Sequence, residues 1–423
     1  MNQTADTVEH RASDRTSDRS QRPSTRSLRG LDWLNFFLAD VQTGVGPFLA
    51  IYLAGYAWNE QQVGLALTVG GVAGIIAQTP AGALTDRLHA KRALIGIGIG
   101  GLAVGALLIA FAPLFWPVMA AQVLIGGMSS VFIPAICAIS LGIVGHELFD
   151  SRQGRNQGFN SAGNVVAAAS MGLLGYFVSN RSIFFFVALC TLPTLIVLCL
   201  IRPEEIDYEL ARGAKESDAN QHAGVRVLLE DRPLVIFLIC AVLFHFANAA
   251  MLPLLGEMLS KGQGRSSMAF MSACVITTQL TIALLASWAG RKASSWGRKP
   301  LLLIGFAALP LRAVLYTLTS SPVALVAIQV LDGVGAGVFG VVSVLVIADL
   351  TQGTGRFNLT LGAITTAVGI GASLSQFIAG SIVHTLGYSA GFLFLGAIAA
   401  VALAILYFFM PETGKHHPKS PSP

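Results

Sequence analysis

The sequence predicts an all-α membrane protein whose twelve transmembrane helices form two six-helix bundles in a parallel 6+6 pseudo-repeat. Three observations support this fold class. The chain of 423 residues is 54% hydrophobic and only 12% charged, whereas a soluble globular protein carries about 25% charged residues. Its uncharged runs are long enough to cross a bilayer, and its two halves resemble each other at a nearly constant spacing. The composition therefore excludes a soluble globular protein and a disordered chain.

The twelve helices are located by runs with few or no charged residues, since a spanning helix needs about 20 mostly apolar residues. Segments of one-helix length are 31–56, 61–85, 156–180, 182–201, 233–256, 266–290, 300–318 and 323–349. Two further runs, 93–146 and 357–411, are about twice as long. A single helix of that length would overshoot the bilayer. We therefore expect the first run to fold back near residues 113–117 and the second near 384–388.

The same runs define the domains. Residues 31–202 are expected to form an N-terminal six-helix bundle and residues 232–411 a C-terminal one, joined by a charged cytoplasmic linker at 203–231. The polar segment 1–30 has no apolar core, so we expect a disordered cytoplasmic tail there and not a signal peptide. Residues 412–423 form a second cytoplasmic tail.

The distribution of lysine and arginine predicts the orientation, because cytoplasmic loops retain these residues. With the N-terminus inside, 23 of the 27 fall on the inner side, and the outer loops hold only Arg181, Lys261 and Arg265. We therefore expect a multi-pass protein of the plasma (inner) membrane with both termini in the cytoplasm. Anionic lipid at the inner leaflet accounts for the formal net charge of +5, so no nucleic-acid partner is expected.

The two halves of the chain correspond at an offset of 206 to 208 residues. The matching positions are Pro47 and Pro253, Gly82 and Gly290, segments 122–126 and 329–333, and segments 202–204 and 410–412. Six helices is an even number, so both halves enter the membrane from the same side. This predicts a parallel repeat about an axis along the membrane normal, which is an arrangement of secondary transporters.

The loop after the second helix carries a family resemblance. Residues 82–92 read GALTDRLHAKR, and the equivalent loop at 290–299 reads GRKASSWGRK. The first resembles the signature loop of the major facilitator superfamily, Gly-x-Leu-Ala-Asp-Arg-x-Gly-Arg-Lys/Arg-Lys/Arg, with His89 and Ala90 in place of Gly-Arg. The second has Ser294 where the family has Asp. The resemblance extends over residues 31–412 and implies a secondary transporter that is usually monomeric.

The two loops are predicted to act as a gate. A carboxylate at Asp86 can bind a cation or a helix N-terminus in one conformation and lose it in another. The resemblance implies the same role, a charge relay that holds the inner side closed. The alternative is a charge cluster that only fixes topology. The predicted gating residues are Gly82, Asp86, Arg87, Lys91 and Arg92 in the first loop and Gly290, Gly297, Arg298 and Lys299 in the second.

Charged residues inside the bilayer are the candidates for proton coupling, since each is costly unless it is paired or neutralised. Asp40 and Asp332 each lie nine residues into a helix, roughly 13 Å deep at 1.5 Å per residue. At that depth we expect a raised pKa and a role as proton carrier. Arg312 cannot readily lose its proton, so it either pairs with Asp332 or extends toward the outer headgroups. His245 is a third candidate, although a buried neutral histidine is the alternative.

Neutral polar residues are expected around a central substrate cavity, to which Arg312 is also assigned. They are Gln42, Gln122, Asn164, Asn248 and Gln329. Hydrogen bonding between helices is their alternative role. Many members of the family carry an arginine at the position of Gln122. Because this arginine is absent here, Asp40 or Asp332 would have to take over its part in proton transfer. Segment 163–172 also lacks the Gly-Pro pair common in antiporters of the family.

The sequence thus predicts a secondary active transporter of a small molecule, driven by protons and exporting its substrate by antiport. One alternative is a proton-coupled uptake permease for an organic anion or metabolite, in which Arg312 or His245 attracts the substrate. Another is a membrane sensor without transport. The chain has no phosphate-binding Gly-x-x-x-x-Gly-Lys-Ser/Thr segment, and its cysteines lack metal spacing. We therefore expect no enzyme activity, no cofactor and no metal.

Overall fold

The computed structural model describes residues 23–43, 46–88, 90–208, 231–264, 266–351 and 357–414. Within these ranges the regular structure is helical. Most of the predicted tail 1–30, most of the linker 203–231 and residues 415–423 lie outside the described residues. The first helix begins at Thr25, six residues before the predicted boundary, because the hydroxyl of Ser24 accepts a hydrogen bond from the Ser27 amide at 3.2 Å and caps the helix.

Seven helices form the N-terminal half. They are α2 (Thr25–Thr43), α3 (Pro47–Ala54), α4 (Glu60–Arg87), α5 (Lys91–Phe111), α6 (Phe115–Ser129), α7 (Phe132–Phe177) and α8 (Ser182–Leu198). The predicted fold-back near residues 113–117 is confirmed by the break between α5 and α6. Helix α7 changes direction at Gly145, whose φ of 72° is a left-handed value that glycine adopts without strain.

A short 3-10 turn at Pro203–Glu205 follows α8. Seven α-helices then form the C-terminal half. They are α9 (Arg232–Ala249), α10 (Met251–Gln263), α11 (Ser266–Trp296), α12 (Arg298–Leu318), α13 (Pro322–Leu350), α14 (Phe357–Leu386) and α15 (Tyr388–Phe409). Sharp turns separate α11 from α12 at Gly297 and α14 from α15 at Gly387, with φ values of 89° and 86°. The second predicted fold-back, near residues 384–388, is thereby confirmed.

Nine helical segments of the described residues are long and apolar enough to cross a membrane, and α8 is a shorter apolar helix. They coincide with the runs that the sequence leaves almost free of charge. Many side chains on their outer faces are large and apolar, such as Trp116 and Leu284, which are 77% and 78% exposed. Such surfaces are stable only in contact with lipid.

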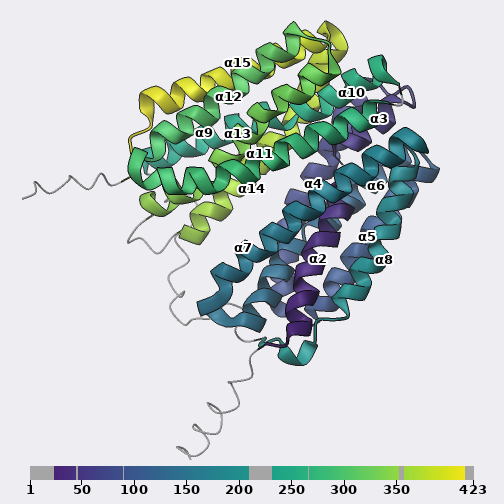
Figure 1. Cartoon of the computed structure of the whole chain (residues 1–423), viewed down its shortest axis with the longest axis vertical. Helices are drawn as coiled ribbons and strands as arrows, with labels where there is room; N and C mark the ends of the chain where they lie inside the picture. The colour runs from purple at the N-terminus through teal and green to yellow at the C-terminus, as the bar shows by residue number, and fades with distance from the viewer. Residues whose placement is uncertain are drawn as a thin grey trace, which may run out of the picture.

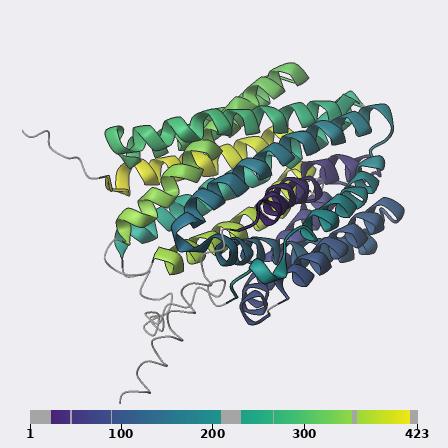
Figure 2. The same ribbon diagram turned by 60° about the horizontal axis from the view of Figure 1, so that its bottom comes forward.

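The helices α2–α8 lie on one side of the molecule and α9–α15 on the other (Figures 1 and 2). The two groups meet where α4 packs against α14, α7 against α11 and α3 against α10. We call the end that carries α3, α10 and the turn at Gly387 the closed end. The opposite end, which carries the start of α2 and the end of α15, is the tail end. At the closed end one hydrophobic core continues from α3 into α10 and α11.

Backbone contact is very close along α4 and α14. A Cβ atom on Gly64 would lie 2.2 Å from the carbonyl oxygen of Gln376, and one on Gly380 would lie 2.4 Å from that of Glu60. The hydroxyl of Thr68 donates a hydrogen bond of 2.6 Å to the carbonyl oxygen of Ser373. These glycines therefore allow the two halves to seal against each other toward the closed end.

Candidate functional site

A cavity of about 280 Å³ lies between the two halves, next to the sealed contact. Its wall comes from α4 and α6 on one side and from α9 and α14 on the other. Its polar side chains are Gln122, Ser373 and Gln376. This position between the halves is where the substrate cavity was expected, and Gln122 is the predicted cavity residue that lines it.

Gln122 is held in place on the cavity wall. Its amide nitrogen donates to the carbonyl oxygen of Ala66 at 3.2 Å, and its amide oxygen is buried without a hydrogen-bond partner among the described residues. Helices α4 and α6 approach so closely here that a Cβ on Gly126 would lie 2.0 Å from the Gly70 carbonyl oxygen. The close approach fixes the backbone around Gln122, whereas its unpaired amide oxygen is enclosed and can accept from a donor in the cavity only after the side chain rearranges.

Two cavity residues, Ser373 and Gln376, were missed by the sequence prediction. The amide nitrogen of Gln376 donates to the carbonyl oxygen of Ala249 at 2.9 Å. A signal existed, since the two polar residues are three apart in a run without charges and therefore share a helix face.

The predicted pairing of Arg312 with Asp332 is confirmed. One guanidinium nitrogen of Arg312 donates to a carboxylate oxygen of Asp332, and the hydroxyl of Thr278 donates to the other carboxylate oxygen at 3.1 Å. The side chain of Arg312 is 0% exposed, so it does not extend to the headgroups. Its remaining polar nitrogens, Nε and Nη2, have no hydrogen-bond partner within the described part of the chain.

Gln329 belongs to the same buried cluster. Its amide nitrogen donates to the hydroxyl of Tyr316 at 2.7 Å, and the Tyr316 ring lies 5.6 Å from the guanidinium carbon of Arg312. The cluster is enclosed by α11, α12 and α13. The structure therefore places Arg312, Asp332 and Gln329 inside the C-terminal half, whereas Gln122 faces the cavity between the halves.

The other predicted residues of the membrane interior are distributed over several helices. His245 on α9 has ring contacts with Phe244 and Phe339, at centroid distances of 5.4 and 4.9 Å. The amide oxygen of Asn248 is buried without a hydrogen-bond partner among the described residues. Asn164 donates to the amide oxygen of Asn160 at 3.2 Å. The side chains of Asp40 and Gln42, near the end of α2, lie outside the described part of the structure.

The first of the two predicted gating loops connects α4 to α5. The ammonium of Lys91 is buried and donates to the Thr85 carbonyl oxygen at 2.5 Å, and Arg92 donates to that of Leu198 at 3.2 Å. Both interactions tie the start of α5 to its neighbours. Gly82 lies within α4 and Arg87 is its last residue. The side chain of Asp86, the proposed latch, is not among those described.

The second predicted gating loop has acidic partners that the sequence prediction missed. The backbone amides of Arg298 and Lys299 donate to the carboxylate of Glu412, at 2.7 and 3.1 Å, and the guanidinium of Arg298 lies 3.0 Å from Asp349. Gly297 provides the turn, and Gly290 lies about two helical turns before it on α11. Glu412 and Asp349 thus supply negative charge to a loop in which the family's acid is replaced by Ser294.

A second buried ion cluster joins α2 to α7 near the tail end. Arg152 and Arg155 both donate to the carboxylate of Asp32, which is 3% exposed. Arg152 is 5% exposed and also donates to the Asn156 amide oxygen at 2.8 Å, whereas Arg155 is 61% exposed. The charge of Asp32 was overlooked because it stands at the very start of the first apolar run.

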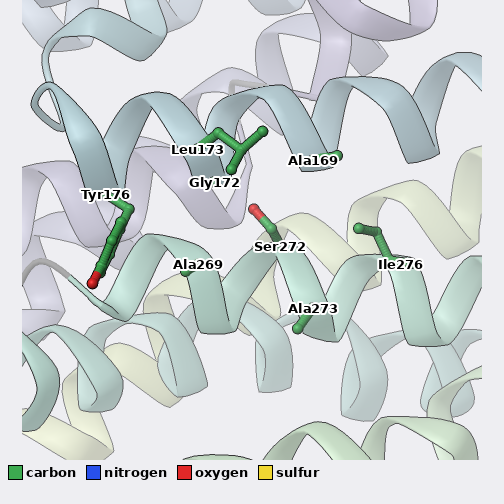
Figure 3. Close-up of a pocket in the computed structure, with 8 residues that line it drawn as sticks. All are labelled: Ala169, Gly172, Leu173, Tyr176, Ala269, Ser272, Ala273 and Ile276. Carbon is green, nitrogen blue, oxygen red and sulfur yellow. The ribbon is translucent and has the colours of Figure 1, made fainter.

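The lateral contact between the halves is apolar. Helices α7 and α11 face each other across small residues, with Leu173, Tyr176 and Ile276 at the edges of a shallow groove (Figure 3). A Cβ on Gly172 would lie 2.2 Å from the hydroxyl of Ser272. These residues belong to the last turns of α7 and the first turns of α11. Small side chains therefore add a second close contact between the halves near the closed end.

Comparison with known proteins agrees with this architecture. The family model of the Major Facilitator Superfamily matches residues 33–309 and 237–423. Two uncharacterized MFS-type transporters of Mycobacterium tuberculosis, from strains CDC 1551 / Oshkosh and ATCC 25618 / H37Rv, are 46% identical over 395 residues, covering 92% of this chain and 94% of each relative.

Solved structures share the fold at low sequence identity. The nucleoside transporter NupG is 15% identical, with a TM-score of 0.74 over 92% of this chain and 100% of its own. The peptide transporter POT in complex with sulfate is 14% identical, with a TM-score of 0.74 over 93% of this chain and 95% of its own. The resemblance inferred from the two gating loops is confirmed, and the chain is a membrane transporter and not an enzyme: it belongs to the major facilitator superfamily.

Proposed function

We propose that the chain is a monomeric secondary active transporter that moves a small molecule by alternating access. The observation that carries this proposal is the cavity beside Gln122, which lies between two helix groups that are sealed against each other toward one end. A site between two such groups can be exposed to either side in turn when one group rocks against the other.

The membrane arrangement proposed here has twelve helices in two parallel six-helix bundles. The nine candidate spans support it, together with α8, the part of α7 after Gly145, and a first helix made of α2 and α3. The distribution of lysine and arginine supports cytoplasmic termini in the plasma membrane, with the closed end facing outward.

We propose that protons drive the transport and that the substrate is exported by antiport. Asp40 is the first proposed proton carrier, from its depth in the first helix, and Asp332 is the second. Protonation of Asp332 would leave Arg312 as an uncompensated charge in the protein interior. A proton at this site therefore favours a rearrangement of α12 and α13, which is what coupling requires. His245, packed against two phenylalanine rings, stays a third prediction.

The buried position of Arg312 bears on the uptake alternative. An arginine that attracts an anionic substrate has to present its guanidinium to the cavity, whereas this one is enclosed and bound to Asp332. This observation argues against Arg312 as the residue that attracts an anion and leaves His245 as the candidate of the uptake alternative.

A pH-gradient assay in sealed proteoliposomes tests the proposed function. Pools of cationic, neutral and anionic compounds are applied to the wild type, to Asp40→Asn and to the double variant Arg312→Gln/Asp332→Asn, which removes both charges of the pair. Glu204→Gln, at an exposed acid of the tail end, is the matched control. We expect substrate-triggered proton movement in the wild type and the control, and its loss in at least one of the other two. Substrate flux without proton movement in all four proteins would refute proton coupling.

A further inference from the structure

The closed end contains a cluster of ionisable side chains that joins the two halves. Glu60, at the start of α4, belongs to the N-terminal half. Its partners belong to the C-terminal half: Lys261 on α10, Tyr388 on α15 and His384 on α14. These residues stand at the ends of apolar runs, so the sequence prediction treated them as helix boundaries and not as a site.

Glu60 is the centre of the cluster. One of its carboxylate oxygens accepts hydrogen bonds from the ammonium of Lys261 and from the hydroxyl of Tyr388, the latter at 3.2 Å. The other carboxylate oxygen lies 3.5 Å from Nδ1 of His384. The side chain of Glu60 is 10% exposed. A single carboxylate of one half thus contacts three polar side chains of the other half.

A second carboxyl group lies next to this contact. Glu257, one helical turn before Lys261 on α10, is 2% exposed and within electrostatic reach of both Glu60 and Lys261. It is also within reach of Tyr388. The charged and titratable groups that face Glu257 are therefore Glu60, Lys261 and Tyr388. His384 contacts Glu60 and not Glu257 itself.

The buried carboxylates are not balanced by a buried cation. The side chains of Glu60 and Glu257 are 10% and 2% exposed, whereas that of Lys261 is 58% exposed. A net negative charge buried away from water is costly, and one proton makes the three groups together neutral. The imidazole of His384 is 44% exposed and stands at the rim of the cluster, whereas Glu257 is enclosed, so the proton belongs on Glu257.

We propose that Glu60, Glu257 and Lys261 form a proton-binding site that holds one proton on Glu257 when the closed end is shut and releases it when that end opens to water. This inference rests on the proposed function, because it adds a proton site at the outer gate to a proton-driven transporter. The proton is taken up from outside as this end shuts and returns to the outside when it opens, so it controls the outer gate and is separate from the proton that drives transport.

The sign of the pH dependence follows from linkage. The shut state binds one proton more than the open state, so acidification favours the shut state. One proton changes the ratio of shut to open molecules by up to about tenfold per pH unit. A charged His384 would attract Glu60 and act in the same direction. Protonation of Glu60 would weaken its pair with Lys261 and act in the opposite direction.

Distances between spin labels across the closed end test this site. Labels are attached at Leu114→Cys and Leu318→Cys, which are 67% and 72% exposed on opposite halves, in full-length protein whose native cysteines have been replaced. The distance distribution is measured in lipid vesicles between pH 8 and pH 5, without substrate. We expect the short-distance population of the wild type to grow as the pH falls.

The variants assign the proton. Glu257→Gln, which imitates the protonated side chain, should stay shut at every pH, whereas Glu257→Asp, His384→Asn and the distant control Glu204→Gln should keep the response. An unchanged pH response in Glu257→Gln would overturn the site, and so would a pH-independent wild type or a response lost only in His384→Asn. The measurement needs no substrate. Transport with a pH-independent closed end would refute this site alone, and a pH-dependent closed end without transport would refute the proposed function alone.

Discussion

Removal of the carboxylate from the Arg312–Asp332 pair should destabilise the protein strongly. In Asp332→Asn, the guanidinium of Arg312 keeps its charge but loses the carboxylate that neutralises it. The side chain is 0% exposed, and Nε and Nη2 have no hydrogen-bond partner among the described residues. No water or headgroup can therefore replace Asp332 without a local opening of α12 and α13.

The magnitude follows from this enclosure. Breaking a buried pair by removing one partner costs about 3–5 kcal/mol, and we expect Asp332→Asn to fall in that range. Arg312→Met should cost less, because an aspartate left alone can take up a proton, whereas an arginine cannot lose one. The double variant Arg312→Met/Asp332→Asn leaves no buried charge, so it should be more stable than Asp332→Asn. Thr278→Val removes only the neutral donor to Asp332 and should cost about 1 kcal/mol.

The assay is unfolding in mixed detergent, followed by circular dichroism, for the four proteins of the cycle and for Thr278→Val. The account requires a coupling free energy between the two substitutions, with Asp332→Asn as the least stable variant. Additive effects would refute the reasoning, as would an Asp332→Asn variant no less stable than Thr278→Val, since either result would mean that Arg312 is solvated or paired elsewhere.

Three further predictions concern the contacts between and within the halves. Gly64→Val places side-chain atoms against a backbone oxygen of α14 and should lengthen the spin-label distance across the closed end. Gly100→Val, at a glycine with open space around it, should leave the distance unchanged, and equal distances in the two variants would contradict the tight contact. Arg152→Met should lower the free energy of unfolding by about 2 kcal/mol, because it loses a buried charged hydrogen bond. Arg155→Met should lower it by at most about 1 kcal/mol, because this side chain is exposed. The reverse order would be evidence against the burial argument. Burial tends to raise the pKa of Glu205, but hydrogen bonds from the serines at the start of α2 hold it below its ordinary value. Their stabilisation is therefore present above the pKa of the unfolded chain and is lost as the pH falls. The protection factors of the amides of residues 24–30, which are corrected for the intrinsic pH dependence of exchange, should fall on acidification in the wild type and stay constant in Glu205→Gln.

Charge spacing predicted where the chain crosses the membrane better than where its helices end. The spans and both fold-backs were predictable, because a bilayer tolerates few charges over about 20 residues. Helix ends obey local hydrogen bonding instead. Helix α2 begins at the capping residue Ser24, and α7 runs on through the charged stretch 147–155 after bending at Gly145. A charge marks the limit of the apolar run, and a helix can continue past it.

The buried pair was predictable for a related reason. Arg312 and Asp332 each interrupt an apolar run, and a charge inside a membrane protein needs a partner. Glu60 and Glu257 escaped the same argument because they stand at the ends of runs, where a charge is normally solvated. Their burial arises from the packing of α4 against α14 and of α3 against α10. It depends on tertiary contacts between distant segments, since Glu60 is 201 residues from Lys261 and 328 from Tyr388.

The central claim, that the two halves rock about a site between them, is tested most directly by measuring both ends of the molecule at once. One pair of spin labels spans the closed end at Leu114 and Leu318, and a second spans the tail end at Leu148 and Trp296, which are 57% and 45% exposed. When pH or transported substrate shifts the distances, the account predicts opposite changes, with the tail end narrowing as the closed end widens. Distances that lengthen together at both ends, or a tail end that stays fixed while the closed end opens, would contradict alternating access.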